Sequence, residues 1–248
     1  MNPYHAFLTG IAPFFDGFTD KVVMDVGCEK KGDLIRCLTE DFGARIAIGL
    51  NPMWPNTVVT PRCQIVSGDI RQTNFEDNTF DVIVSNCAFE HIPNLDLALV
   101  EMHRILKPGG YVLSHHGPLW STCYGHHLHL PGGTYWNIVL PPWCHLLMLE
   151  QELAAWLSGK YPPQLIQQIL DWVYRDSGQN RLMYGDHVRI YKDSPLDLCF
   201  CHGYTYPELS DRYRGMMTGE VIQNLKSRYP NEEGFFYEGI DVLMRKRG

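Results

Sequence analysis

Short runs of apolar residues alternate with amphipathic stretches over the first half of the chain. Val22–Val26 is an apolar, β-branched run of strand length with one acidic residue, Asp25, near its end. Such a run predicts a strand that is buried on both faces. Similar runs predict four further strands, over residues 45–50, 64–67, 81–85 and 111–114.

Amphipathic stretches separate these predicted strands. Apolar residues recur at helical spacing from Leu34 to Phe42, with Asp33 at the position of an N-cap and Gly43 at that of a left-handed C-cap. A second helix is predicted over 96–106, and the stop signal at 107–110 ends it. Strand–helix alternation with short linkers predicts a doubly wound, mostly parallel α/β sheet with right-handed crossovers.

This alternation is lost after the fifth predicted strand. Residues 115–194 are rich in aromatic residues, histidine and proline. We interpret residues 1–248 as a single domain, with 115–194 inserted as a substrate lid that folds over the carboxyl ends of the strands. Further elements are predicted as helices at 146–157, 163–175 and 218–228 and as strands at 196–201 and 239–245.

Composition narrows the class of protein. The net charge of −7 and the pI near 5.8 disfavour a nucleic-acid partner. No basic leader and no apolar run of membrane-spanning length occur, and the eight cysteines form no paired CxxC sets. We therefore expect reduced thiols, a cytoplasmic protein without a membrane span and a small-molecule substrate, whereas the oligomeric state stays open.

Parallel sheets bind ligands beyond the carboxyl ends of their strands. Residues 25–32, Asn51, Asp69 and 85–91 each follow a predicted strand, so they should share one edge of the sheet. The sequence therefore predicts the binding site at this edge.

Four motifs of the chain resemble those of the class I S-adenosylmethionine-dependent methyltransferase family, especially its small-molecule branch. They are V-V-M-D-V-G-C at 22–28, S-G-D-I at 67–70, F-E-D-N-T-F-D-V-I-V-S at 75–85 and L-K-P-G-G-Y at 106–111. The resemblance covers roughly residues 21–114. It implies a seven-stranded, Rossmann-like methyltransferase fold with an antiparallel last strand, and S-adenosylmethionine as the cofactor.

The resemblance also implies roles for individual residues. Asp25 would hold the cofactor's ammonium, Asp69 would accept a hydrogen bond from the adenine amino group, and Asn51 stands where the family has an acid that binds the ribose. The implied cofactor site consists of Asp25, Gly27, Cys28, Asn51, Asp69, Ile70 and Asn86.

The chain departs from the family pattern at three positions. Glu29 and Lys31 replace loop glycines, and Asn51 replaces the acid, which removes one charge-assisted hydrogen bond. Three alternatives follow: another residue compensates, which we favour, the cofactor affinity is modest, or the protein is a catalytically silent module that binds a partner. A dinucleotide-dependent oxidoreductase is disfavoured, because residues 27–32 do not match G-x-G-x-x-G and Glu29 would oppose a pyrophosphate.

Histidines and aromatic residues form the second candidate cluster. A neutral imidazole can accept the proton of a hydroxyl during methyl transfer, and we predict this role for His126 or His127, with His91 orienting groups near the methyl. Structural roles, or a metal site that also includes His129, are the alternatives. The predicted aromatic lining of the acceptor pocket is Trp120, Tyr135, Trp136 and Trp143.

The sequence thus predicts methyl transfer from S-adenosylmethionine to a small molecule. The expected acceptor atom is a hydroxyl oxygen on a sugar or a secondary metabolite, and nitrogen and carbon stay open. No resident metal is expected.

Overall fold

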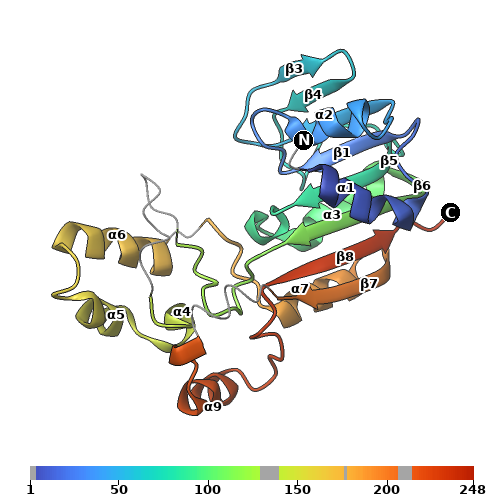
Figure 1. The fold of residues 1–248 in the computed structure, drawn as a ribbon. Helices are drawn as coiled ribbons and strands as arrows, with labels where there is room; N and C mark the ends of the chain where they lie inside the picture. Colours follow the sequence, from blue (N-terminus) through green and yellow to red (C-terminus); the bar gives the residue numbers. More distant parts are fainter. Residues whose placement is uncertain (1–3, 129–139, 176–177, 206–213) are drawn as a thin grey trace. The chain divides into compact units, whose positions relative to one another are not determined.

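The computed structural model describes residues 4–128, 140–175, 178–205 and 214–248 (Figure 1). The chain divides into two compact units. Unit 1 comprises Met1–His116, Arg189–His202 and Asp241–Gly248, and unit 2 comprises Gly117–Val188 and Gly203–Ile240. The positions of His129, Tyr135 and Trp136 lie outside the described residues, and the placement of 115–194 over the sheet stays a prediction.

One eight-stranded sheet is present in the described residues, with the order β3-β4-β2-β1-β5-β6-β8-β7 (Figure 1). Strands β1, β2, β4, β5 and β6 pair in parallel, and β3 pairs antiparallel with β4. The strands are β1 (Val22–Val26), β2 (Ile46–Leu50), β3 (Thr57–Thr60), β4 (Cys63–Val66), β5 (Phe80–Asn86), β6 (Leu106–His116), β7 (Asp197–Tyr204) and β8 (Gly239–Arg245).

The last strand runs antiparallel to β6, as the family resemblance implied. The Lys246 amide donates to the Gly110 carbonyl at 2.9 Å. Nδ1 of His115 lies 2.7 Å from Oδ1 of Asp241. Later residues of β6 therefore lie beside earlier residues of β8, which is the antiparallel arrangement. The predicted mostly parallel α/β class is confirmed. Seven strands were predicted, and the additional one is β3, whose four residues form a short hairpin with β4 across Pro61 and Arg62.

Helices cover both faces of this sheet. Helix α2 (Asp33–Glu40) connects β1 to β2, and helix α3 (Leu95–Ile105) connects β5 to β6 in the opposite direction along the sheet. Right-handed crossovers in opposite directions place the two helices on opposite faces, which is the doubly wound arrangement. Helices α1 (His5–Ile11) and α2 pack on the face that carries Val23, Ala47 and Val82.

Several predicted element boundaries were wrong. The helix predicted at 146–157 is two helices, α4 (Cys144–Leu147) and α5 (Glu150–Leu157), and the C-cap of α2 is Asp41 rather than Gly43. Asp33 is the first residue of α2 rather than its cap, and the N-cap is Gly32 in the left-handed conformation. The predicted stop signal at 107–110 lies inside β6, because Gly109 and Gly110 exchange hydrogen bonds with Lys246. Tertiary pairing with the last strand therefore overrides the local turn signal.

Unit 2 contains two buried apolar clusters. One gathers Leu128, Leu140 and Cys144 with residues of α5 (Glu150–Leu157) and α6 (Pro163–Tyr174). The other gathers Cys123, Trp143, Leu146, Leu225 and Phe235. The remaining helical elements are η1 (Ala12–Phe15), η2 (Phe89–His91), α4 (Cys144–Leu147), α7 (Tyr184–Asp193), η4 (Arg214–Met216) and α9 (Gly219–Arg228).

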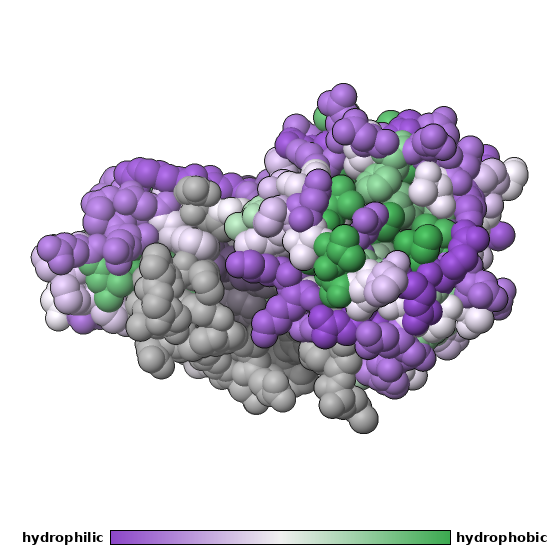
Figure 2. Space-filling view, turned by 90° about the horizontal axis from the view of Figure 1, so that it is seen from above, coloured by the Kyte–Doolittle hydropathy of each residue, from purple (hydrophilic) through white to green (hydrophobic). Residues whose placement is uncertain are grey.

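Hydrophobic residues are exposed at the β3 end of unit 1. Figure 2, seen from above, shows such residues among hydrophilic ones on this unit. Met53 and Val58, before and within β3, are 74% and 75% exposed. Among the helices in the described ranges, none is long and apolar enough to cross a membrane.

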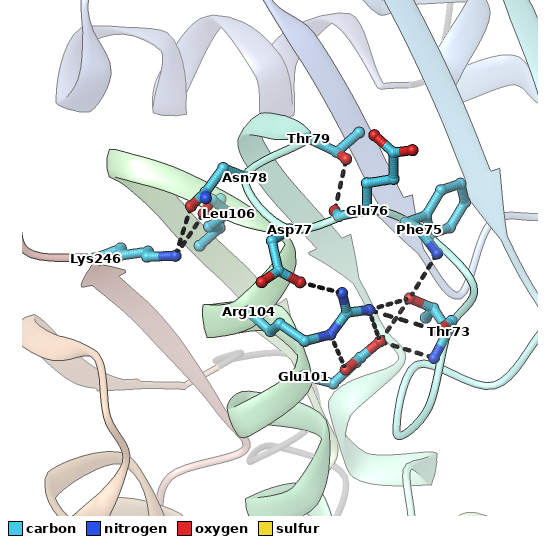
Figure 3. Close-up of polar contacts among 10 residues, drawn as sticks. All are labelled: Thr73, Phe75, Glu76, Asp77, Asn78, Thr79, Glu101, Arg104, Leu106 and Lys246. Carbon is cyan, nitrogen blue, oxygen red and sulfur yellow. Dashed lines mark hydrogen bonds and ion pairs between the residues drawn. The ribbon is translucent and has the colours of Figure 1, made fainter.

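An ion-pair network fixes the segment that precedes β5 (Figure 3). Glu101 on α3 accepts hydrogen bonds from the Thr73 amide at 2.8 Å and from the Arg104 guanidinium at 2.7 Å. Arg104 also donates to Asp77 at 2.6 Å. The Arg104 guanidinium, followed by Thr73, lowers the pKa of Glu101 to about 2, because both groups favour its ionised form.

We therefore expect Glu101→Gln to lower the free energy of unfolding by about 1.5–3 kcal/mol at pH 7. A depressed carboxyl pKa stabilises the fold above pH 4.5, and this contribution is lost as the pH falls toward about 2. The difference between wild type and variant should thus shrink between pH 5 and pH 3. Urea unfolding at several pH values measures it, with the exposed Glu76→Gln as control; a pH-independent difference would contradict the ion-pair account.

Candidate functional site

The structure places the predicted cofactor residues after four adjacent strands. The strands β4, β2, β1 and β5 are neighbours in the sheet and parallel, so their carboxyl ends meet at one edge. Asp25 lies at the end of β1, Asn51 follows β2, Asp69 follows β4, and Asn86 ends β5. All of these residues belong to unit 1.

Asp25 is a buried carboxyl group. It is 3% exposed, and burial raises its pKa to about 7, with a smaller contribution from the charge of Glu29 and an opposing hydrogen bond from Cys28. A carboxylate kept from water is stabilised most by a nearby cation. The group is therefore suited to hold an ammonium.

Gly27 allows the loop after β1 to turn tightly against the loop after β5. Its φ of +86° lies in the left-handed region, and a Cβ placed there would lie 2.3 Å from Cβ of Ala88. The Gly27 amide donates to Leu50 of β2 at 2.9 Å. The close packing of these two loops therefore requires a glycine at this position, whether or not a cofactor also approaches it.

Glu29 occupies the amino-terminal end of α2. Its carboxylate accepts hydrogen bonds from the amides of Gly32 at 2.7 Å, of Asp33, and of Leu34 at 3.4 Å. The first amides of a helix have no partner within the helix and carry partial positive charge. Glu29 therefore replaces the predicted Asp33 cap, and the departure from the glycine pattern has a structural role.

Asn51 holds the loop after β1 through its side chain. Its Nδ2 donates to the Cys28 carbonyl at 2.9 Å, and Nε1 of Trp54 donates to the same oxygen at 3.0 Å. The Asn51 Oδ1 accepts from the Met53 amide at 2.9 Å. A carboxylate here would lose the donor to Cys28, which gives a physical reason for the amide.

Asp69 is engaged by a neighbouring arginine. Arg71 donates to it through Nε at 3.0 Å and through Nη2 at 2.5 Å. These bonds lower the pKa of Asp69, so the group is ionised and retains lone pairs for a further donor. Ile70 beside it is buried.

Asn86 and His91 lie on and after β5. Asn86 is half-buried and pairs with His115 of β6. His91 is exposed at the end of η2, with Nε2 3.9 Å from the buried Glu90. Of the three histidines predicted to act in catalysis, His91 therefore lies in unit 1.

Sequence reasoning missed Tyr4 and Tyr191 in unit 1, whereas it named His116 as a fallback base if His126 and His127 proved dispensable. Burial, followed by the charge of Glu29, raises the pKa of Tyr4 to about 12, which places this residue near the loop after β1. His116 is fully buried, with Nδ1 3.1 Å from Ser114 Oγ and Nε2 3.0 Å from the Tyr191 hydroxyl. No sequence signal joins residues this far apart.

His126 and His127 belong to unit 2. Nδ1 of His126 accepts from the Leu128 amide at 3.1 Å, and Nδ1 of His127 contacts Nε2 of Gln179. Since both partners are donors, the neutral rings carry their proton on Nε2. Burial lowers the pKa of His126 well below its usual value. The base role predicted for either residue stays a prediction, and it requires the other tautomer.

In the described parts of the chain, no group of three or more His, Cys, Asp or Glu side chains is arranged to hold a metal. The alternative of a metal at the histidine cluster has no support from these residues.

Comparisons with known proteins agree with this geometry. Residues 24–114 match the family model described as "Methyltransferase domain". The chain is 37% identical over 97 residues to the sterol 4-C-methyltransferase strm-1 of Caenorhabditis elegans, covering 35% of this chain and 28% of that protein. It is 28% identical over 125 residues to a demethylmenaquinone methyltransferase of Staphylococcus epidermidis, covering 48% of each. The chain thus spans less than half the length of these relatives.

Solved structures share the fold across nearly the whole chain. An S-adenosylmethionine-dependent methyltransferase from Mesorhizobium loti has a TM-score of 0.55 at 14% identity, covering 98% of this chain and 97% of that one. A geranyl diphosphate C-methyltransferase from Streptomyces coelicolor, solved with S-adenosyl-L-homocysteine, has a TM-score of 0.53 at 14% identity, covering 96% and 76%. Residues 24–114 therefore match the methyltransferase domain family that the motifs resemble, and the solved structures share its fold.

The role of Glu29 can be tested by its removal. We expect Glu29→Ala to lower the free energy of unfolding by about 1–2 kcal/mol, because the first amides of α2 lose their acceptor. Glu40→Ala, at the exposed carboxyl end of the same helix, is the matched control. Urea unfolding measures both, and an equal effect of the two changes would refute the capping role.

Proposed function

We propose that this chain, in which residues 24–114 are a class I S-adenosylmethionine-dependent methyltransferase domain, transfers a methyl group to a small molecule. The observation that carries the proposal is Asp25, a buried carboxyl at the end of β1 beneath a tightly turned loop. Its environment disfavours an isolated negative charge and therefore favours a cationic ligand. S-adenosylmethionine carries an ammonium and a sulfonium.

The residues at this edge of the sheet can each bind a different part of the cofactor. Asp25 would bind the ammonium, Asp69 would accept from the adenine amino group, and the backbone at Asn86 would contact the methionyl part. Asn51 has committed its Nδ2 to Cys28, so its contact with the ribose would be made through Oδ1 or a water. Glu29 and Asn51, which depart from the family pattern, both have hydrogen-bond partners within or beside the loop. This supports a functional site over a silent one.

For the acceptor, we propose a small molecule with a hydroxyl group. Methylation of its oxygen is the first candidate, because histidines are available to receive the hydroxyl proton. Methylation of carbon is the second, and it is favoured by the sterol 4-C-methyltransferase relative, which is 37% identical over the matched 97 residues. Mass spectrometry of the product distinguishes a methyl ether from a new carbon–carbon bond.

The cofactor proposal predicts a pH-dependent affinity. An ammonium stabilises ionised Asp25, whose pKa in the free protein is about 7, so binding below this pH must release a proton. We expect the affinity for S-adenosylhomocysteine to rise about tenfold from pH 6 to pH 8, as one proton linked to a pKa of 7 requires. Asp25→Asn should weaken binding and flatten this profile.

Isothermal titration calorimetry across this pH range measures both effects. The exposed Asp96→Asn is the matched control and should keep the affinity and the profile of the wild type. If the wild type fails to bind millimolar S-adenosylhomocysteine at pH 8, the active-enzyme proposal is refuted in favour of a silent binding module.

The proposed base is tested by turnover. A general base contributes about 10²–10⁴-fold, so His126→Ala, His127→Ala or His91→Ala should lower kcat by this order while S-adenosylhomocysteine affinity is retained. The activity should also fall as the base becomes protonated at low pH. Full turnover in all three variants would place the base elsewhere, and lost cofactor affinity would identify a structural histidine.

A further inference from the structure

Two histidine rings in unit 2, that of the buried His126 and that of the half-buried His145, form a pair. The rings of His126 and His145, which we call the imidazole pair, have centroids 5.5 Å apart and lie at 81° to each other. His126 is 4% exposed. Nε2 of His126 and Nδ1 of His145 are both buried, and neither has a hydrogen-bond partner among the residues that the structure describes.

The hydrogen-bond partners of the other two ring nitrogens determine which nitrogen of each ring carries the proton. The Leu128 amide donates to Nδ1 of His126, so the neutral ring carries its proton on Nε2. Nε2 of His145 lies 2.7 Å from the Trp120 carbonyl, which can only accept, so this ring carries its proton on Nε2 and leaves Nδ1 bare. The pair therefore presents one donor, at His126, and one acceptor, at His145.

Both rings stay neutral near pH 7. Burial is the main cause of the lowered pKa in each case, well below the usual value for His126 and to about 4 for His145. A charged ligand group would find no opposite charge in these two rings. A buried polar atom without a hydrogen bond is unfavourable, so two such atoms among the described residues point to a bound partner.

The surroundings of the pair are aromatic and apolar, and they include Arg181, which lies over the Trp120 ring, 5.0 Å from its centroid, and whose charge adds to the effect of burial in lowering the pKa of His145. The Trp120 ring lies 4.6 Å from that of His145, and His145 itself stands between Cys144 and Leu146, which belong to the two apolar clusters of unit 2. Leu128, the residue that His126 holds by its amide, is part of the first cluster. A ligand at the pair would thus meet two polar atoms within an apolar and aromatic setting.

We propose that the imidazole pair binds the hydroxyl group of an apolar alcohol. The hydroxyl oxygen accepts from Nε2 of His126, and the hydroxyl proton is donated to Nδ1 of His145. A carbonyl or an ether would satisfy His126 alone, and an ammonium would satisfy His145 alone. A metal ion would need a lone pair at both nitrogens, and Nε2 of His126 has none to give. The proposal rests on the proposed function for the class of its ligand, a small molecule with a hydroxyl group, and in it His126 donates to the hydroxyl rather than acting as its base.

Two substitutions separate binding from structure. In His126→Asn, the amide oxygen replaces Nδ1 and can still accept from Leu128, but the Nε2 donor is lost. In His145→Gln, the amide nitrogen replaces Nε2 and can still donate to Trp120, but the Nδ1 acceptor is lost. Both variants should therefore unfold at nearly the wild-type temperature. His202→Gln, an exposed histidine of unit 1, is the matched control.

The probes are 1-decanol, 4-tert-butylcyclohexanol and cholesterol, each compared with its methyl ether by tryptophan fluorescence. At least one alcohol should bind the wild type about three- to tenfold more tightly than its ether, the effect of one neutral hydrogen bond. His126→Asn and His145→Gln should each remove this preference, and His202→Gln should keep it. Nitrogen-15 NMR of labelled histidine should show the His126 proton on Nε2.

Three outcomes would overturn the proposal. The first is equal binding of every alcohol and its ether, which indicates that a water molecule occupies the pair. The second is an unchanged preference in both variants, and the third is a His126 proton on Nδ1. None of these measurements uses a methyl donor. A failure here, with S-adenosylhomocysteine still bound, would therefore reject the alcohol site and leave the proposed methyl transfer standing.

Discussion

A carboxyl group buried at the end of a parallel strand is the constraint on which the candidate site depends. Asp25 is almost excluded from water, and the residues around it form a loop that closes over β1. Gly27 makes room for Ala88, Asn51 and Trp54 hold the Cys28 carbonyl, and Glu29 caps the next helix. Each contact helps to fix the shape of the loop beside this buried carboxyl.

The sheet could be predicted from the sequence because its strands are short, continuous apolar runs. Val22–Val26 and Phe80–Asn86 are buried nearly throughout, and such runs have few alternative structures. Prediction failed where pairing between distant residues decides the structure. Gly109 and Gly110 predict a turn, yet both lie within β6, because their backbones are hydrogen-bonded to the backbone of Lys246, more than 130 residues later.

The site was predictable in its position and less so in its contacts. Strand ends identified Asp25, Asn51 and Asp69, since parallel strands bring their carboxyl ends together. The partners of these residues were not predictable. Trp54 and Arg71 belong to no recognised motif, so their contacts with the site could not be predicted. Glu29 departs from the glycine pattern of the loop, and its role follows only from the three backbone amides that it accepts from. In unit 2, the tautomers of His126 and His145 depend on backbone partners that spacing does not reveal.

The insertion of β8 between β6 and β7 has a consequence for the order in which this protein can fold. Strand β6 ends at His116, and its neighbour β8 begins at Gly239, so more than 120 residues must be synthesised before the two can pair. Contacts of such long sequence separation form slowly. Until they form, the edge of β6 that faces away from β5 has unpaired backbone groups.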